Sequence, residues 1–304
     1  MLLLKYTIYH GSFLVFPFLV FLWWASKKYS NKKFRLVIVF FVLLSVLFTY
    51  SRFIEPQIIT SQYESLVFSQ PEDKQESSVA TVAIFSDVHL GLYKGPGFMR
   101  RAVEKINKAE PDVVVIPGDF IYEMDEDEFD RFFASLADIS APVYAVAGNH
   151  DSERPGRISS AKVREKVGEN GVKFIDNAFE TIVIDGKLLK IYGLSDFWEG
   201  RSDVQQLKNI RPEDNTIVII HNPDAVYEFP NYDMDLVVAG HTHGGQIRIP
   251  WVYKYAIPTE YSFDRDWYDI EQTKLFITSG LGEIGLPMRL LVPPEVVYMT
   301  VFLW

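Results

Sequence analysis

Two long apolar runs open the chain, and shorter apolar runs alternate with amphipathic segments through the rest of it. The first run, residues 2–25, exceeds the roughly 20 residues that cross about 30 Å of hydrocarbon. The second, residues 34–51, approaches that length only if Phe34 and a snorkelling Arg35 are included. Residues 1–55 therefore predict a membrane anchor of two transmembrane helices. The alternatives are a signal peptide or a pair of buried core helices.

Charge along the anchor predicts its orientation. The loop between the two runs carries five basic residues: Lys27, Lys28, Lys32, Lys33 and Arg35. Only Lys5 and Arg52 lie near the outer ends, so the positive-inside rule places the loop in the cytoplasm and the rest of the chain outside. Trp23 and Trp24, beside the basic loop, suit an aromatic belt at the membrane surface.

The remaining chain divides into a tether and one domain. Residues 56–80 lose the long apolar runs and gain Gln, Ser, Glu and Pro, which predicts a solvated linker. Residues 81–304 are enough for one hydrophobic core. Strands are predicted from Val- and Ile-rich runs starting at 81, 112, 143, 216 and 235, and at 179–184, 188–193, 274–278 and 296–302. Helices are predicted over 97–109, 127–137 and 158–168, which favours an α/β fold of two stacked sheets with helices outside.

Composition narrows the chemistry. The chain contains no cysteine, so a metal site must use His, Asp, Glu or Asn, and no thiol nucleophile exists. The net charge is -10, and the residues outside the basic anchor carry more than all of that excess. An acidic body repels a polyphosphate backbone, so no nucleic acid is expected as a partner.

Five of the six histidines follow the ends of predicted strands: His89, His150, His221, His241 and His243. Asp87 comes two residues before His89, and alternate residues of an extended strand point the same way. Strand ends at one sheet edge reach a common crevice, where such side chains would meet. A lone histidine is more often a polar core or surface residue, but this pattern predicts a site. Imidazole and carboxylate ligands suit Mn, Zn, Fe or Ni, and their number implies two divalent ions.

The five motifs together resemble those of the calcineurin-like metallophosphoesterases in order and spacing. They are Asp87-Val-His89, Gly118-Asp119, Gly148-Asn149-His150-Asp151, His221 and Gly240-His241-Thr242-His243. The resemblance covers residues 81–300 and implies a four-layer α/β/β/α sandwich with a dinuclear centre, Mn being the first expectation. It also implies a metal-dependent hydrolase of phosphoric esters or anhydrides.

The same resemblance assigns the ligands. One metal would be held by Asp87, His89 and His243. The other would be held by Asn149, His221 and His241. The Asp119 carboxylate would bridge the two.

Two further residues receive catalytic roles. By the resemblance His150 would approach the phosphate, and an imidazole with a pKa of about 6.5 can protonate a leaving oxygen near neutrality. Asp151 would orient His150 or, alternatively, cap a helix. A non-catalytic scaffold on the same fold is the remaining alternative, but it should have lost ligands and this chain has lost none.

Loops near the C-terminus supply the substrate-binding candidates. Residues 280–285 have the G-x-G-x-x-G spacing, but no βαβ unit follows, so a turn is expected. Arg289 would meet a substrate phosphate or form a surface ion pair. Residues 251–268 are rich in aromatic residues; Trp198 and Trp251 would line a lipid-facing slot, or the stretch packs over the sheet edge.

An anchor and aromatic loops favour a membrane-associated phosphorylated lipid or nucleotide-lipid as substrate. The layout resembles the membrane-linked branch of the family, which includes bacterial UDP-2,3-diacylglucosamine pyrophosphatases of lipid A biosynthesis. The shorter soluble hydrolases of that pathway resemble Gly-Asn-Arg-Asp where this chain has His150. That lipid is a cytoplasmic intermediate, whereas the charge rule puts the domain outside the bacterial cytoplasmic membrane, so one prediction must fail. The alternative is an extracytoplasmic phosphodiesterase or phosphatase acting on a soluble nucleotide or other phosphoester.

Overall fold

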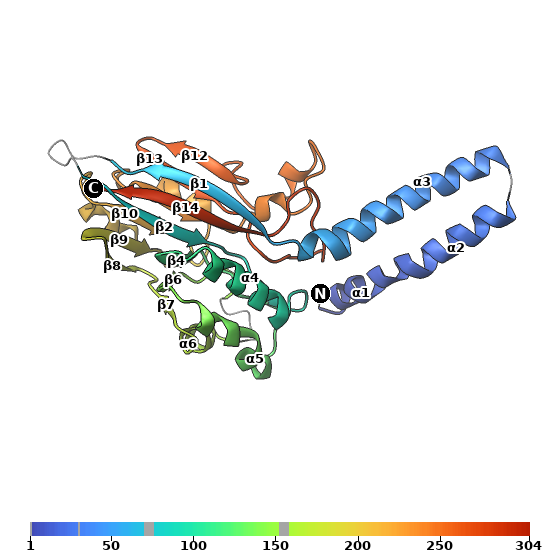
Figure 1. Ribbon diagram of the computed structural model, residues 1–304, viewed down its shortest axis with the longest axis horizontal. Coiled ribbons are helices and arrows are strands. Elements are labelled where there is room, and N and C mark those ends of the chain that lie inside the picture. The colour runs from blue at the N-terminus through green and yellow to red at the C-terminus, as the bar shows by residue number, and fades with distance from the viewer. Residues whose placement is uncertain (1, 30, 70–75, 152–157) are drawn as a thin grey trace.

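The computed structural model of this chain describes residues 2–29, 31–69, 76–151 and 158–304. Two six-stranded sheets stack face to face, and a helical hairpin projects from one end of them (Figure 1). The expected mixed α/β fold with two sheets is therefore confirmed.

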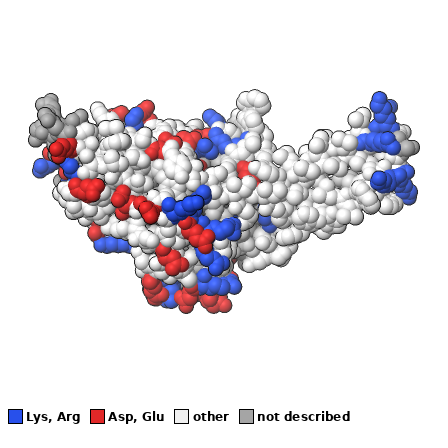
Figure 2. Space-filling model, viewed as in Figure 1, with Lys and Arg blue, Asp and Glu red and all other residues white. Residues whose placement is uncertain are grey.

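The hairpin is built from three apolar helices: α1 (Leu2–Gly11), α2 (Val15–Lys28) and α3 (Lys32–Thr49). Leu3–Lys28 and Lys32–Gln57 are each long and apolar enough to cross a bilayer. Only 11% and 22% of their most apolar stretches are buried, so they are not core helices of the domain. Figure 2 shows an uncharged shaft that ends in a basic tip.

The first sheet has the strand order β1-β14-β2-β4-β6-β7 and is parallel except between β14 and β2. Its strands are β1 (Thr60–Val67), β2 (Ser78–Ile84), β4 (Val113–Ile116), β6 (Val143–Ala145), β7 (Val172–Phe174) and β14 (Glu295–Leu303). Its outer face is covered by α4 (Pro96–Lys108), α5 (Phe129–Phe133) and α6 (Ser160–Gly168) (Figure 1). These helices lie where the apolar periodicity predicted them.

The second sheet has the strand order β12-β13-β11-β10-β9-β8, with antiparallel hairpins at both edges. Its strands are β8 (Ala178–Ile184), β9 (Lys187–Gly193), β10 (Thr216–Ile219), β11 (Leu236–Ala239), β12 (Asp266–Ile270) and β13 (Thr273–Ile277). Short 3-10 helices, η6 (Val204–Asn209) and η7 (Pro223–Glu228), contribute to its outer layer, which is thinner than the resemblance implied. Pro223 and Pro230 limit helix length between β10 and β11.

The space between the sheets holds a continuous apolar core. Alternate residues of the central strands are fully buried there, for example Val82 and Ile84 of β2 and Ile217 and Ile219 of β10. This is the period-2 pattern of a strand with one face on the core. The packed sandwich holds the strand ends at fixed positions, and the loops beyond them carry the site.

The expected linker over residues 56–80 is wrong for much of its described length. Thr60–Val67 forms β1, which pairs along its whole length with β14. Trp267 also donates a hydrogen bond from its indole nitrogen to Glu64, at 2.8 Å. The segment looked like a tether because an edge strand with an exposed face tolerates polar residues. Residues 70–75 lie outside the described residues.

Five buried charged residues join the hairpin to the domain; we call them the junction cluster: Arg52, Glu55, Lys94, Glu283 and Arg289. Arg52 stacks over the rings of Tyr9 and Phe53. Glu55 accepts a hydrogen bond from the Val292 amide at 2.7 Å, and Lys94 pairs with Glu283 at 3.0 Å. These contacts pack the hairpin directly on the domain.

Candidate metal centre

The predicted ligands lie together beyond the ends of β2, β4, β6, β10 and β11. In that order, the loops carry Asp87 and His89, Asp119, Asn149 with His150, His221, and His241 with His243. The small parallel pair of β3 (Leu90–Gly91) and β5 (Ile121–Tyr122) ties the first two loops together. The loops beyond these strand ends therefore bring the predicted ligands together.

The backbone at these residues is unusual. Five of the seven predicted ligands have positive φ: Asp87 at 50°, His89 at 48°, Asp119 at 58°, His241 at 70° and His243 at 52°. Residues 85–89 therefore do not continue the strand, and the expectation that Asp87 and His89 share a face of an extended strand is wrong. Such conformations cost about 1–3 kcal/mol each and cluster where function demands them.

Two glycines allow the loops to approach one another. A Cβ atom at Gly148 would overlap the carboxylate of Asp119. A Cβ atom at Gly240 would overlap the carboxylate of Asp87 and the hydroxyl of Ser86. Both positions need glycine because a side chain there would collide with the carboxylate of a predicted ligand.

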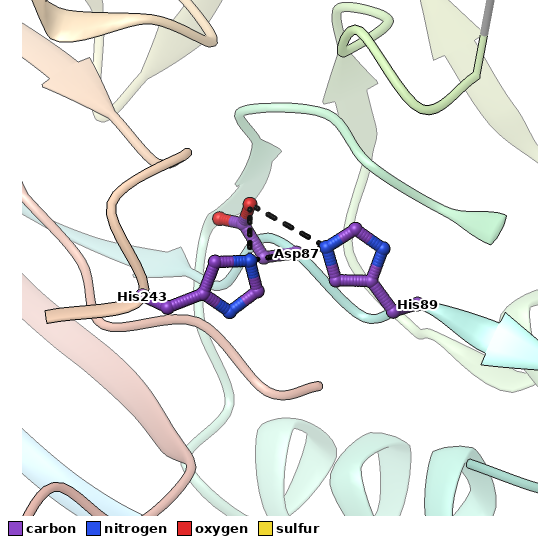
Figure 3. Close-up of side chains that lie close together, drawn as sticks. All are labelled: Asp87, His89 and His243. Carbon is purple, nitrogen blue, oxygen red and sulfur yellow. Dashed lines mark hydrogen bonds and ion pairs between the residues drawn. The ribbon is translucent and has the colours of Figure 1, made fainter. Parts of the chain in front are cut away.

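Asp87, His89 and His243 form the first group of converging ligands (Figure 3). The Nε2 atoms of the two histidines lie 3.1 Å apart. Asp87 Oδ1 lies 3.5 Å from His243 Nε2 and 4.0 Å from His89 Nε2. All three residues are buried.

His221, His241 and Asn149 form the second group. His221 Nε2 lies 3.0 Å from Asn149 Oδ1 and 3.1 Å from His241 Nδ1. Asp119 lies between the groups, since its Oδ2 atom is 3.5 Å from His89 Nε2 and 3.3 Å from His221 Nε2. One carboxylate oxygen therefore faces both sets of ligands.

Backbone carbonyls fix which histidine nitrogens carry protons. His89 Nδ1 donates to Ile121, His221 Nδ1 to Pro117 and His241 Nε2 to Pro258, at 3.3, 2.7 and 3.2 Å. A carbonyl only accepts, so the opposite nitrogen of each ring presents a lone pair to the cluster. Lone pairs and carboxylate oxygens that converge on one another need cations between them. The cluster thus fits divalent metals.

The pKa values of the predicted ligands also indicate that the site would be stabilised by positive charge. Burial lowers the pKa of His89 and of His241 to about 3, so both are neutral ligands. At His221 burial opposes the charge, but the Asp119 carboxylate outweighs it and raises the pKa to about 10. Burial raises the pKa of Asp87 to about 6. A cation would replace the proton that His221 otherwise holds, and it would offset the buried negative charge of Asp87.

His150 lies beside the first group. Its ring is 5.1 Å from the ring of His89 and 5.7 Å from that of Tyr122, edge to face in both cases. Its backbone amide donates to Asp119 Oδ1 at 2.8 Å. This position next to the ligands suits the role in proton transfer that the resemblance implied.

Asp151 is buried and holds backbone amides of two neighbouring loops. One of its oxygens accepts from the amides of Phe120 and Ile121, and the other from that of Gly148. These bonds tie two ligand loops together and make Asp151 a scaffold for the loop of Asp119, while its orientation of His150 stays a prediction. Burial, with the nearby charge of Asp119, raises the pKa of Asp151 to about 7. A helix cap here would involve residues 152–157, outside the described residues.

The three candidate substrate-binding residues differ in their exposure and in their position relative to the predicted ligands. Trp198 stacks edge to face on His241, with ring centroids 4.4 Å apart, and is half exposed beside the cluster. Trp251 is 88% exposed and projects from the loop after the last ligand motif. Arg289 is 0% exposed and donates to the carbonyls of Ser279, Gly280, Gly282 and Val292, so its predicted contact with substrate is wrong. Residues 280–285 form irregular backbone with bends in the loop from β13 to β14, and no helix follows them.

Two residues at the site were missed from the sequence. The Ser86 hydroxyl donates to Asp87 Oδ2. The ring of Tyr122 lies against His89 and His150, and its hydroxyl accepts from the Gly285 amide at 3.1 Å. The place of Ser86, directly before Asp87, was a usable signal; nothing in the spacing marks Tyr122.

The cluster opens into a pocket of about 340 Å³, which we call the metal pocket. Asp119, His241 and His243 lie at it. Apolar residues form much of the remaining lining: Ile247, Ala256, Pro258, Ile284 and Leu286. A phosphate at the metals would therefore have an apolar wall beside it.

The fold and this cluster are those of a metal-dependent phosphoesterase. Residues 80–245 match the family of calcineurin-like phosphoesterases, and the chain belongs to that family. Its members hydrolyse phosphoesters, so the chain is a hydrolase of that class.

Three relatives of this chain are named for different activities. The metallophosphoesterase YkuE of Bacillus subtilis is 28% identical over 83% of this chain and 88% of its own length. Phosphodiesterase YaeI of Escherichia coli is 25% identical over 73% of this chain and 82% of its own. UDP-2,3-diacylglucosamine pyrophosphatase LpxG of Chlamydia muridarum is 25% identical over 70% and 81%.

Proposed function

We propose that this chain hydrolyses a phosphodiester or pyrophosphate bond of a membrane-associated lipid or nucleotide-lipid, using two divalent metal ions. The observation that carries the proposal is the position of Asp119 Oδ2, within 3.5 Å of a histidine from each ligand group. A shared carboxylate between two such groups is the arrangement that holds a metal pair. Mn is the first candidate, with Zn, Fe and Ni as alternatives.

The chain's own residues have distinct tasks. Asp87, His89 and His243 would hold one ion, and Asn149, His221 and His241 the other. Bound divalent ions supply Lewis-acid chemistry that offsets the negative charge of the phosphoryl group. His150 holds a proton beside the ligands and delivers it to the leaving oxygen. Trp198 and the apolar wall of the metal pocket exclude water from one side of the substrate.

Packing of the hairpin supports a membrane-associated substrate. Lys5 of α1 pairs with Glu123 at 2.6 Å and lies over the ring of Tyr122, which contacts His150. Tyr9 of α1 stacks on Tyr93 with centroids 5.7 Å apart. If the hairpin spans a bilayer, these contacts hold the metal pocket close to the membrane surface.

Two substrates of different kinds follow from the relatives. The likeness to LpxG supports UDP-2,3-diacylglucosamine, which requires a domain on the cytoplasmic side of the bacterial inner membrane. The likeness to YaeI supports a phosphodiester, and the basic tip of the hairpin favours an extracytoplasmic domain. We propose the inner membrane as the location in both cases. Identification of the substrate would then show on which side of this membrane the domain lies.

The experiment uses the purified full-length protein with Mn²⁺. Release of UMP from UDP-2,3-diacylglucosamine and cleavage of bis-p-nitrophenyl phosphate are measured, with Asp119→Asn as the blank. UMP release supports the pyrophosphatase and a cytoplasmic domain. Cleavage of the chromogenic diester alone supports another phosphoester outside the cytoplasm. Absence of both activities from folded, metal-loaded protein would refute the proposal.

A further inference from the structure

We propose that an apolar groove between the hairpin and the loops beyond β11 binds an acyl chain of the substrate and leads it to the metals. The groove measures about 410 Å³, and we call it the acyl groove. Its lining includes Phe18, Phe41, Phe48, Ile249, Met288 and Leu290. The inference rests on the proposed function, because it names the part of the substrate that lies beside the reacting phosphate.

The acyl groove and the metal pocket are neighbours, since Ile247 lines both. A short backbone ladder fixes this shared wall. The Arg248 amide donates to Leu290 at 2.9 Å, and the Leu290 amide donates to Gln246 at 3.0 Å. The Gln246 side chain in turn accepts from the amide of Ile284, which also lines the metal pocket, at 2.8 Å. The two cavities are therefore held side by side by one piece of structure.

The groove is also fixed relative to the hairpin. The Arg289 amide donates to the Ser51 carbonyl at 2.9 Å, at the end of the second apolar segment. The Arg289 side chain is anchored at the same time in the carbonyls of the 279–292 loop. Met288 and Leu290, on either side of Arg289, line the groove together with residues of α3.

Position and chemistry favour a lipid chain as the occupant. The groove lies along residues of Leu3–Lys28 and Lys32–Gln57, so in a bilayer it faces hydrocarbon. A soluble nucleotide gains nothing from the apolar wall. A phosphate at the ligands with an attached chain fills both cavities, and each buried methylene strengthens binding by about fourfold.

A matched pair of variants on α3 tests the groove. Leu44 lines it, whereas its neighbour Leu43 is 63% exposed and lies outside the lining residues. Leu44→Trp fills the groove, and Leu43→Trp places the same ring about 100° round the helix, outside the groove lining. Both positions are exposed, so both proteins are expected to fold.

The substrates are p-nitrophenyl alkyl phosphates with alkyl chains of two to eight carbons, used below their micelle concentrations with protein in amphipols and Mn²⁺. We expect kcat/KM to rise with chain length in the wild type and in Leu43→Trp, and to stay flat in Leu44→Trp. An octyl phosphate with a terminal diazirine should label groove peptides in the first two proteins only.

The outcomes separate the two proposals. A wild type that cleaves every ester at one rate, or two variants that behave alike, would overturn the acyl groove and leave the phosphoesterase intact. A wild type that is folded and metal-loaded but cleaves neither these esters nor UDP-2,3-diacylglucosamine would refute the proposed function itself.

Discussion

Two clusters of buried charge lie in this molecule, and they differ in what their polar atoms face. In the junction cluster, donors face acceptors: the Arg289 guanidinium meets backbone carbonyls, and Lys94 meets Glu283. Among the predicted metal ligands, acceptors face acceptors. Histidine lone pairs and the Asp119 carboxylate converge on one another there. Burial of charge alone therefore does not mark a site. A site for a cation is marked by lone pairs that no proton donor satisfies.

The strongest test of this contrast removes the carboxylate shared by the two ligand groups. Asp119→Asn should lose metal and lower kcat/KM on the order of 10³-fold, since the ions supply several kcal/mol of transition-state stabilisation. Metal content by mass spectrometry and diester cleavage are measured together. A variant that keeps both ions and full rate would contradict the assignment.

The next test concerns the residue beside the ligands. His150→Ala should keep both ions and lower kcat by about 10²-fold, because it removes a proton donor without touching a ligand. The contrast with Asp119→Asn is the measurement: one variant loses metal and the other does not. Loss of metal from His150→Ala would make His150 a ligand instead.

A third test addresses the junction cluster. Arg289→Met should lower the free energy of unfolding by about 3 kcal/mol, because several buried carbonyls lose their charged donor. Metal content and the KM for bis-p-nitrophenyl phosphate, which has no acyl chain, should not change. The exposed Arg211→Met serves as the control and should stay within about 0.5 kcal/mol of the wild type. An unchanged melting temperature with a raised KM would show that Arg289 binds substrate after all.

The ion pair of the junction cluster should also be visible in the pH dependence of stability. Burial lowers the pKa of Lys94 to about 8, although Glu283 partly offsets it. Above pH 8 the folded state loses a proton that the unfolded chain keeps up to a pKa of about 10.4, so stability should rise with pH in this window. Melting curves at pH 7.5, 8.5 and 9.5 measure it. The double variant Lys94→Met/Glu283→Gln should lose the rise; an identical pH profile would contradict this account.

The smallest expected effect lies where the hairpin meets the site. The Lys5 and Glu123 side chains are 12% and 7% exposed, and Lys5→Met should cost about 1 kcal/mol, or about fivefold in rate, on substrate presented in vesicles. Cleavage of a soluble chromogenic diester should not change. Lys5→Arg should restore the rate, and equal losses on both substrates would show that Lys5 acts only through folding.

The sequence predicted the strands and the side chains that converge beyond them because both leave local marks. Central strands show continuous apolar runs, and the ligands follow them directly. The reason given for Asp87 and His89 was nevertheless wrong, since positive φ angles and not an extended strand bring them together. Backbone of that kind is imposed by the packing of several loops, which a local pattern does not contain.

The errors share a cause in contacts between distant segments. β1 was mistaken for a tether because its pairing with β14 joins residues at opposite ends of the chain. Arg289 was assigned to substrate because its acceptors are backbone carbonyls, which carry no residue-specific signal. Tyr122 was missed because its contact with His150 forms only when two separate loops fold against each other.

We propose that the Asp119 carboxylate would be shared by two divalent ions, and Mn²⁺ tests this proposal directly. Metal analysis and electron paramagnetic resonance of the Mn²⁺-reconstituted protein measure the number of ions and their coupling. Two ions per chain with an exchange-coupled spectrum that is lost in Asp119→Asn is the predicted result. One ion per chain with an isolated Mn²⁺ spectrum in the wild type would contradict the account.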